Sequence, residues 1–253
     1  MLKAFFIALG LFTRIPVPKI FYITQKDNEK LYGWSVLFYP LVGLMIGGVL
    51  VFVSWGLSFL ALTSNELLVG AIILSVWVLI TGALHLDGLA DSADAWLGGY
   101  GDQQRTLEIM KDPCSGPAAV VILILVLLLK FSVLINVNWQ ILLLTPVLAR
   151  TAAMILLTTT SYVRSGGMGE SAANNVPSII MWCVVLLVIV LTITLIGTLS
   201  LGLIIIFIIG YLLRAMMKVR IGGVTGDTAG ALIEIIEVAS LIVFVLLSHL
   251  LSL

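Results

Sequence analysis

The 253-residue chain contains few charged residues, few histidines and few cysteines. Asp, Glu, Lys and Arg make up 10% of it, whereas soluble domains contain about 25%. Its 13 basic and 13 acidic residues cancel and form no basic tract, which argues against nucleic-acid binding. The two cysteines, Cys114 and Cys183, cannot form a disulfide framework, and we expect each to pack as a small apolar side chain.

Long apolar runs take the place of charge. The chain is 61% hydrophobic with a mean hydropathy of +1.21, and runs long enough to cross a ~30 Å hydrocarbon core recur along it. Backbone polar groups cannot stay unpaired in lipid, and the runs lack the alternation of barrel strands, so the spans must be helices. We predict an all-α fold, a polytopic membrane bundle of about seven transmembrane helices at about 36–62, 67–84, 117–135, 141–159, 179–196, 199–213 and 230–253.

The first 35 residues precede this bundle. "MLKAFFIALGLF" begins like a secretory signal, but no small-residue cleavage site follows and the apolar run is too short to span. We therefore expect an interfacial helix that stops at Pro16 and Pro18 rather than a signal anchor. A single integral membrane domain, 1–253, then comprises an interfacial segment, 1–35, and a transmembrane bundle, 36–253, with cytoplasmic active-site loops.

The placement of basic residues predicts the orientation. Eleven of the 13 fall on one side of the predicted spans: Lys3, Arg14, Lys19, Lys26, Lys30, Arg105, Lys111, Arg164, Arg214, Lys218 and Arg220. The positive-inside rule makes that side cytoplasmic, with the N-terminus inside and the C-terminus outside. Of the 13 acidic residues only Glu66 falls on the outer side. Charge therefore collects at the cytoplasmic face, mainly in a longest loop of about 85–116 and at helix ends.

The first acidic group lies in "TGALHLDGLADSADAWLGG", residues 81–99. Asp87, Asp91 and Asp94 are spaced i, i+4 and i+7, which places three carboxylates on one helix face. They repel one another unless a cation lies between them, and such an oxygen-rich face suits magnesium; the alternative is a solvated helix end. Gly88 would let a phosphate approach the backbone. His85 is either a proton acceptor, a metal ligand or a hydrogen-bonded residue at the helix end.

The second acidic group lies in "GGVTGDTAGALIEIIEVASL", residues 222–241. Asp227, Glu234 and Glu237 share a face of the helix that enters the last span. Glu234 and Glu237 lie one to three turns inside an apolar helix, where a carboxylate costs roughly 2–3 kcal/mol and needs a partner. They would either complete a metal site with Asp227 or form a structural ion pair with Arg150 or Lys130.

Candidate substrate contacts surround the two acidic groups. Arg105 and Lys111 suit phosphate oxygens, and Asp112 is a further oxygen ligand. Arg150 lies near the centre of a span and must meet a carboxylate or an anionic ligand. The other candidates are Arg14, which alternatively contacts lipid headgroups, Arg164, Thr225 and the backbone amides of Gly222, Gly223 and Gly226. Thr225 or Asp227 can also cap the last helix. Metal-binding carboxylates beside cations are the general equipment of phosphoryl transfer.

The motifs "GALHLDGLADSADA", "RTLEIMKDP", "YVRSGGMG", "FTRIPVP" and "GGVTGDTAGALIEIIE" closely resemble those of the cobalamin synthase family over nearly the whole chain. The resemblance implies a prokaryotic inner-membrane enzyme that joins α-ribazole, or its 5′-phosphate, to adenosylcobinamide-GDP. GMP is released, and adenosylcobalamin or its 5′-phosphate is formed. The resemblance also implies dependence on Mg²⁺ and contact with membrane lipid, and it leaves room for a homo-oligomer or a complex with other cobalamin-assembly enzymes.

In this interpretation the residues take three roles. The metal ligands are Asp87, Asp91, Asp94, Asp227, Glu234 and Glu237, and the catalytic side chains are Asp91, Asp94, His85 and Lys111. The substrate contacts are Arg14, Arg105, Lys111, Asp112, Arg150, Arg164, Gly222, Gly223, Thr225 and Gly226. Cys114 and Ala119 stand where that family usually has a basic residue and a glycine, so we predict no contact from that loop beyond Lys111, Asp112 and Gly116.

Two other functions fit part of the pattern. CDP-alcohol phosphatidyltransferases also combine spaced aspartates with magnesium, but their signature has an arginine where Asp91 stands and a longer spacing than Asp94 gives. An ion-coupled transporter would use the intramembrane Glu234 and Glu237. The charges gather at one face of the membrane, however, and no pair of interrupted helices repeats in the two halves of the chain.

Overall fold

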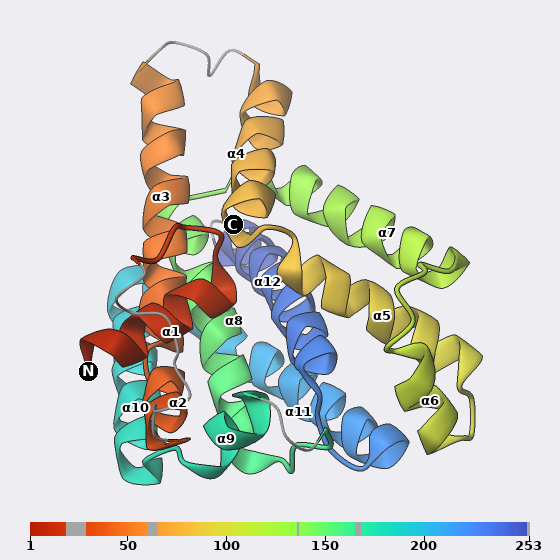
Figure 1. Cartoon of the computed structure of the whole chain (residues 1–253). Coiled ribbons are helices and arrows are strands. Elements are labelled where there is room, and N and C mark those ends of the chain that lie inside the picture. The colour runs from red at the N-terminus through yellow and green to blue at the C-terminus, as the bar shows by residue number, and fades with distance from the viewer. Residues whose placement is uncertain (19–28, 60–64, 136, 165–167, 252–253) are drawn as a thin grey trace.

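A computed structural model of the chain describes residues 1–18, 29–59, 65–135, 137–164 and 168–251. Within those ranges the regular structure is helical, apart from one isolated parallel bridge between Tyr162 and Val224. The elements, in chain order (Figure 1), are α1 (Leu2–Phe12), α2 (Glu29–Val36), α3 (Tyr39–Phe59), α4 (Glu66–Thr81), α5 (Leu84–Gly98), α6 (Gln103–Ile109), α7 (Pro117–Leu134), α8 (Trp139–Thr159), α9 (Met168–Asn174), α10 (Ser178–Ile196), the 3₁₀ helix η3 (Gly197–Leu201), α11 (Gly202–Ile221) and α12 (Gly226–Leu251).

Five helices in the described part of the chain are long and apolar enough to cross a membrane, or six if α4 and α5 form one broken span. The prediction of an all-α polytopic membrane protein is therefore confirmed. This count takes residues 178–221 as one span, although 44 helical residues would extend about 66 Å at 1.5 Å each. Gly197 (φ +54°) and η3 interrupt that segment. Its division into two spans, and with it the count of seven, stays a prediction.

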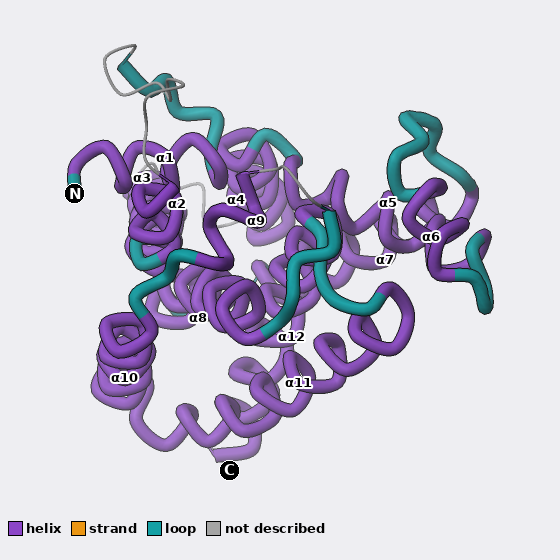
Figure 2. Tube along the Cα trace, turned by 60° about the horizontal axis from the view of Figure 1, so that its bottom comes forward, coloured by secondary structure: helices purple, strands orange, loops and turns teal. Residues whose placement is uncertain are grey.

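Helix α8 lies at the centre of the bundle (Figures 1 and 2). In α8, 78% of the most apolar stretch is buried inside the protein, whereas in α7 the buried share is 22%. Helix α3 packs along α8 with Gly43 and Gly47 facing it. The backbones are so close that a Cβ at Gly43 would lie only 2.5 Å from the Pro146 carbonyl oxygen. Small residues spaced by four allow such close approach of helices in lipid. The outer helices expose large apolar side chains such as Leu186 and Phe207, as a surface in contact with acyl chains requires.

The chain bends by 85° between α4 and α5 (Figure 1). Gly82 (φ +61°) and Ala83 (φ +57°) are both left-handed, which ends α4 and turns the next helix away. Residues 85–116, predicted as the longest connection between spans, contain α5 and α6. Helix α5 carries the three aspartates, as their spacing predicted, and it packs against α12 and α7.

The N-terminal segment forms the expected short apolar helix, α1. It buries Ala8, Leu9 and Phe12 against the bundle and ends at Phe12, before the two prolines. The amide of Arg14 then donates to the carbonyl of Ile80 (2.8 Å), which ties this segment to the α4–α5 bend.

Two further sets of sequence-based expectations concern lysines and cysteines. Lys19 and Lys26 lie outside the described residues. Cys114 and Cys183 are free, as expected, and both are exposed, so neither packs in the protein interior. Exposure on an outer apolar helix suits a small apolar side chain as well as burial does, which explains Cys183.

Candidate active site

Helix α5 carries the first acidic group on a single face, as its spacing requires. The helix begins at Leu84, and Asp87, Asp91 and Asp94 follow one another along its length. It is not itself one of the five spans, because its 15 residues are fewer than the roughly 20 that cross a bilayer. Asp91 is partly exposed, and Asp87 lies at the exposed surface.

Helix α12 brings the start of the second acidic group against α5. The two helices touch at glycines: a Cβ at Gly88 would lie 2.7 Å from the Asp227 carbonyl oxygen, and one at Gly230 would lie 3.3 Å from the Cα of His85. At Gly88 a larger residue would force the helices apart, because the obstructing atom belongs to the backbone, and at Gly230 the fit is tight. Asp227 is 133 to 140 positions after the three aspartates of α5 in sequence, and this crossing places it beside that helix.

The resulting carboxylate group is short of positive charge. Burial, and then the carboxylates of Asp87 and Asp227, raise the pKa of Asp91 to about 6. Arg164 supplies one cation through an ion pair with Asp227 (2.8 Å). The neighbouring hydroxyl of Tyr162 has a pKa raised by burial, so it stays protonated near neutral pH. We name Asp87, Asp91 and Asp227 with Arg164 the acidic face.

Asp94 has a structural role at the far end of α5. Its two carboxylate oxygens accept hydrogen bonds from the amides of Gly116 (2.5 Å) and Ala119 (3.0 Å). Gly116 is the N-cap residue of α7 and Ala119 lies in its first turn, where the first N–H groups have no helical partner. Asp94 thus caps α7 from a neighbouring helix and fixes the 110–116 loop against α5.

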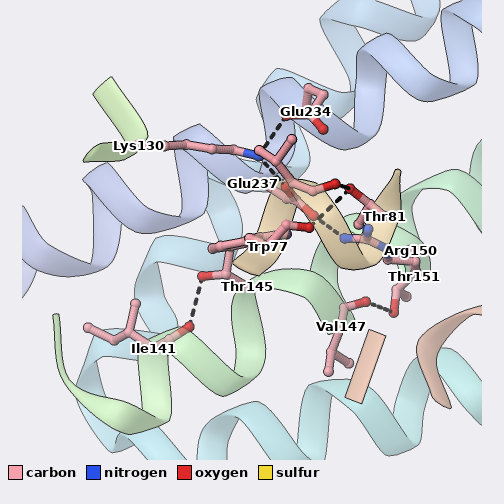
Figure 3. Close-up of polar contacts among 11 residues, drawn as sticks. Trp77, Thr81, Lys130, Ile141, Thr145, Val147, Arg150, Thr151, Glu234 and Glu237 are labelled. Carbon is pink, nitrogen blue, oxygen red and sulfur yellow. Dashed lines mark hydrogen bonds and ion pairs between the residues drawn. The ribbon is translucent and has the colours of Figure 1, made fainter. Parts of the chain in front are cut away.

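Glu234 and Glu237 lie deeper in the bundle and are occupied by cations (Figure 3). Lys130 of α7 donates to Glu234 (2.6 Å) and also to Glu237, which pairs on its other side with Arg150 of α8. The Lys130 ammonium also lies 4.8 Å from the centre of the Trp77 ring. We name Lys130, Arg150, Glu234 and Glu237 the buried ion cluster.

This arrangement realises the ion-pair alternative for both glutamates. Each of the four side chains in the buried ion cluster is at most 4% exposed. Glu234 and Glu237 therefore do not face the acidic face, and Arg150 contacts a carboxylate instead of being open to a substrate. Their metal-binding and substrate-binding roles remain predictions that this geometry does not favour, because Lys130 and Arg150 already pair with the two carboxylates inside the bundle.

The other predicted contacts fall into two sets. Arg105, Lys111 and Asp112 are exposed on α6 and the loop after it, and Asp112 accepts from the Cys114 amide (2.9 Å). Arg164 also reaches the Met110 carbonyl (3.5 Å), so this loop lies near the acidic face. Arg14 lies at the α4–α5 bend, where its side chain covers Gly82.

The glycine-rich turn before α12 serves packing and capping. Gly222 (φ +78°) ends α11, and its amide donates to the Lys218 carbonyl (3.1 Å). Gly223 packs against the Ser161 carbonyl. Thr225 accepts from the Thr228 amide (3.2 Å), as the predicted helix cap requires. Gly226 lies beside Tyr162 and, like Asp227, lines the cavity described next.

A cavity of about 640 Å³ opens beside the acidic face. Asp87, Asp227, His85 and Tyr162 line one part of it. The remainder is lined mainly by apolar and aromatic side chains of α1, α2 and α8, and sequence reasoning missed these. Tyr162 is the first residue of the "YVRSGGMG" motif, so the sequence contained a signal for it. The aromatic residues of α1 and α3 gave none, because they resemble any apolar helix face.

The donor chemistry of the acidic face fits a hard divalent cation. Carboxylate oxygens and an excess of negative charge are what Mg²⁺ requires, and it is commonly held by one or two carboxylates with substrate phosphate and water. Among the residues that the structure describes, no three His, Cys, Asp or Glu side chains converge as a complete metal cage. Oxygen donors without a complete cage are consistent with a magnesium ion that the protein and the substrate hold together.

Fold and site define a class: a polytopic helical membrane protein with an acidic helix face and adjacent cations suited to phosphoryl transfer. The chain belongs to the cobalamin-5-phosphate synthase family, which matches residues 4–245. It is 48% identical to an adenosylcobinamide-GDP ribazoletransferase of Pseudomonas fluorescens Pf0-1, over 93% of this chain and 96% of the relative. It is 45% identical to the protein of that name from Pseudomonas aeruginosa, over 97% and 98%. No solved structure matches it.

Proposed function

We propose that the chain is an adenosylcobinamide-GDP ribazoletransferase of the cytoplasmic membrane of a prokaryote. A hydroxyl of α-ribazole, or of its 5′-phosphate, attacks the phosphorus that carries the cobinamide. The bond from that phosphorus to the bridging oxygen of the diphosphate breaks, and GMP leaves. The observation that carries this proposal is the acidic face, gathered from α5, α12 and Arg164 beside a cavity, in a chain with relatives of that name.

The residues of the acidic face supply charge and position for this reaction. Asp87, Asp91 and Asp227 would hold Mg²⁺, which when bound neutralises charge on the diphosphate. Arg164 lies next to Asp227 and is placed to contact phosphate oxygens. Lys111 and Arg105 lie on the adjoining exposed loop and helix and extend the positive surface toward the donor substrate.

The proton of the attacking hydroxyl needs an acceptor at the cavity. His85 and Asp87 both line it. We assign the role to His85, because its Nδ1 is buried and has no hydrogen-bond partner, whereas Asp87 belongs to the metal-binding face. Neither Asp94 nor the buried ion cluster contacts the cavity, so their proposed contribution is to fix α7, α8 and α12 around it.

The test is transfer by purified protein in detergent, measured as GMP release and as formation of the joined corrinoid. Asp91→Asn and Asp227→Asn are each expected to lower kcat at least 100-fold, as expected when a group that stabilises transition-state charge is lost. Glu66→Gln, an exposed acidic residue on α4, is the matched control and should retain full rate. Full activity in both aspartate variants would exclude the acidic face as the catalytic site.

We also propose that the N-terminus and the 85–116 segment face the cytoplasm and that the C-terminus lies outside. The support is the distribution of lysine and arginine along the sequence. Cys114 is exposed and lies in this segment, so in a Cys183→Ser background a membrane-impermeant maleimide should label it only in inverted vesicles. Labelling in right-side-out vesicles would reverse the orientation.

A further inference from the structure

The cavity beside the acidic face lies between the N-terminal helices and the bundle. Its wall is formed by α1, α2, α8 and α9 on one side and by the start of α5 and α12 on the other. At about 640 Å³ it is in the range of pockets that enclose a small organic ligand. A corrinoid macrocycle with its side chains and nucleotide is too large for such a space, whereas a single nucleoside fits within it.

The charges of the lining exclude a diphosphate from its interior. Asp87 and Asp227 are the charged side chains among the described residues that line the cavity, and neither a lysine nor an arginine is present there. Arg164 meets Asp227 from outside this lining. A phosphate group deeper in the cavity than Asp87 and Asp227 would meet no cationic side chain, so the group that enters this deeper part is uncharged. Phosphate groups of either substrate stay at the acidic face, beside Arg164.

Aromatic rings form a large share of the rest of the lining. Phe6, Phe12, Tyr32 and Tyr39 line it, and the Phe12 and Tyr39 rings meet edge to face with centroids 4.5 Å apart. Phe12 also lies 5.4 Å from the His85 ring. Such surfaces favour a flat aromatic group, because stacked and edge-on ring contacts add to the free energy of burial.

His85 points to a ligand independently of the cavity's shape. Its side chain is 5% exposed, it lines the cavity, and Nδ1 has no hydrogen-bond partner. A buried polar atom without a partner is costly, so a native site normally supplies one. A hydroxyl of a bound ligand would supply it at the boundary between the aromatic part and the two aspartates.

We infer that this cavity is the acceptor site, and that it takes the uncharged two-ring aromatic base of α-ribazole among Phe12, Tyr39 and their neighbours. The ribose then lies toward Asp87 and Asp227, and one of its hydroxyls bonds His85 Nδ1. This inference rests on the proposed function and adds the placement of one substrate. The nucleoside and its 5′-phosphate share the base, so both are expected to compete for the site.

A variant that narrows the cavity tests this placement. Gly10 of α1 lines it, and a Cβ there would meet only Val17, at 3.7 Å, so Gly10→Trp adds a large side chain without a backbone clash. The matched control is Gly56→Trp on α3, where a Cβ has open space and the cavity is distant. We expect Gly10→Trp to raise KM for α-ribazole and for its 5′-phosphate at least tenfold, with KM for adenosylcobinamide-GDP unchanged within twofold.

A second measurement does not depend on a variant. The free benzimidazole base should inhibit the wild-type protein competitively against α-ribazole and not against adenosylcobinamide-GDP. The acceptor site would be overturned if the base competed with adenosylcobinamide-GDP, or if Gly10→Trp left the KM for α-ribazole unchanged. It would also be overturned if native mass spectrometry showed a stoichiometric phospholipid that Gly10→Trp displaces. Absence of all transfer by wild-type protein would instead contradict the proposed function, so the two failures are distinguishable.

Discussion

Replacing Lys130 by Met tests whether the buried ion cluster holds α7, α8 and α12 together. Lys130 is almost fully buried and donates to both Glu234 and Glu237, and Arg150 is the second cation of the cluster. Methionine keeps the unbranched apolar stem and removes the charge. The change leaves two buried carboxylates against one guanidinium, and removing one partner of a buried pair costs about 3–5 kcal/mol. We expect the free energy of unfolding to fall by that amount.

A double-mutant cycle separates the ion pair from packing. Glu234→Gln removes the carboxylate that Lys130→Met leaves without a cation, so the double variant should recover about 1.5–3 kcal/mol relative to the sum of the single changes. Unfolding is followed by tryptophan fluorescence during titration of detergent micelles with SDS. Lys218→Met on α11 replaces an exposed lysine and should change stability by no more than about 0.5 kcal/mol. Additive single effects would refute a direct interaction between Lys130 and Glu234.

Three further predictions concern the acidic face. Gly88→Leu would push a side chain into the Asp227 backbone, so we expect it to lower the free energy of unfolding by about 1–3 kcal/mol or more and to abolish transfer. The control is Gly48→Leu, where a Cβ has open space, and it should change neither quantity. Thermal unfolding and the transfer assay compare the two variants. The raised pKa of Asp91, about 6, means that the folded protein binds this proton more tightly than the unfolded chain does, so ionisation costs stability as pH rises from about 4 to 6. In EDTA, Asp91→Asn should therefore raise Tm at pH 7 and leave it unchanged at pH 4, and an equal shift at both values would contradict the assignment. Mg²⁺ should raise the Tm of the wild type and of Glu234→Gln but not that of Asp91→Asn. If Mg²⁺ failed to raise the Tm of Glu234→Gln and still raised that of Asp91→Asn, the metal ligands would be the glutamates and not the acidic face.

Much of the architecture could be predicted from the sequence, because lipid imposes simple rules. Apolar runs of span length must be helical, and the i, i+4, i+7 spacing of Asp87, Asp91 and Asp94 places them on one face wherever that helix lies. The cap at Thr225 and the short N-terminal helix also follow from local chemistry. The motifs were sufficient to indicate the family that the comparison confirms.

The partners of each charge were decided only by the tertiary structure. Periodicity shows which face a carboxylate occupies but not which helix lies opposite, so Glu234 and Glu237 were compatible with a metal site or with cations. Lys130, 104 and 107 positions away in sequence, meets them because α7 packs on α12. In the same way Asp94 caps a helix that starts 23 residues later, and α1 closes a cavity whose aromatic lining no local pattern distinguishes. Local sequence fixes the direction of a side chain along its own helix, whereas its neighbours depend on how all the helices pack.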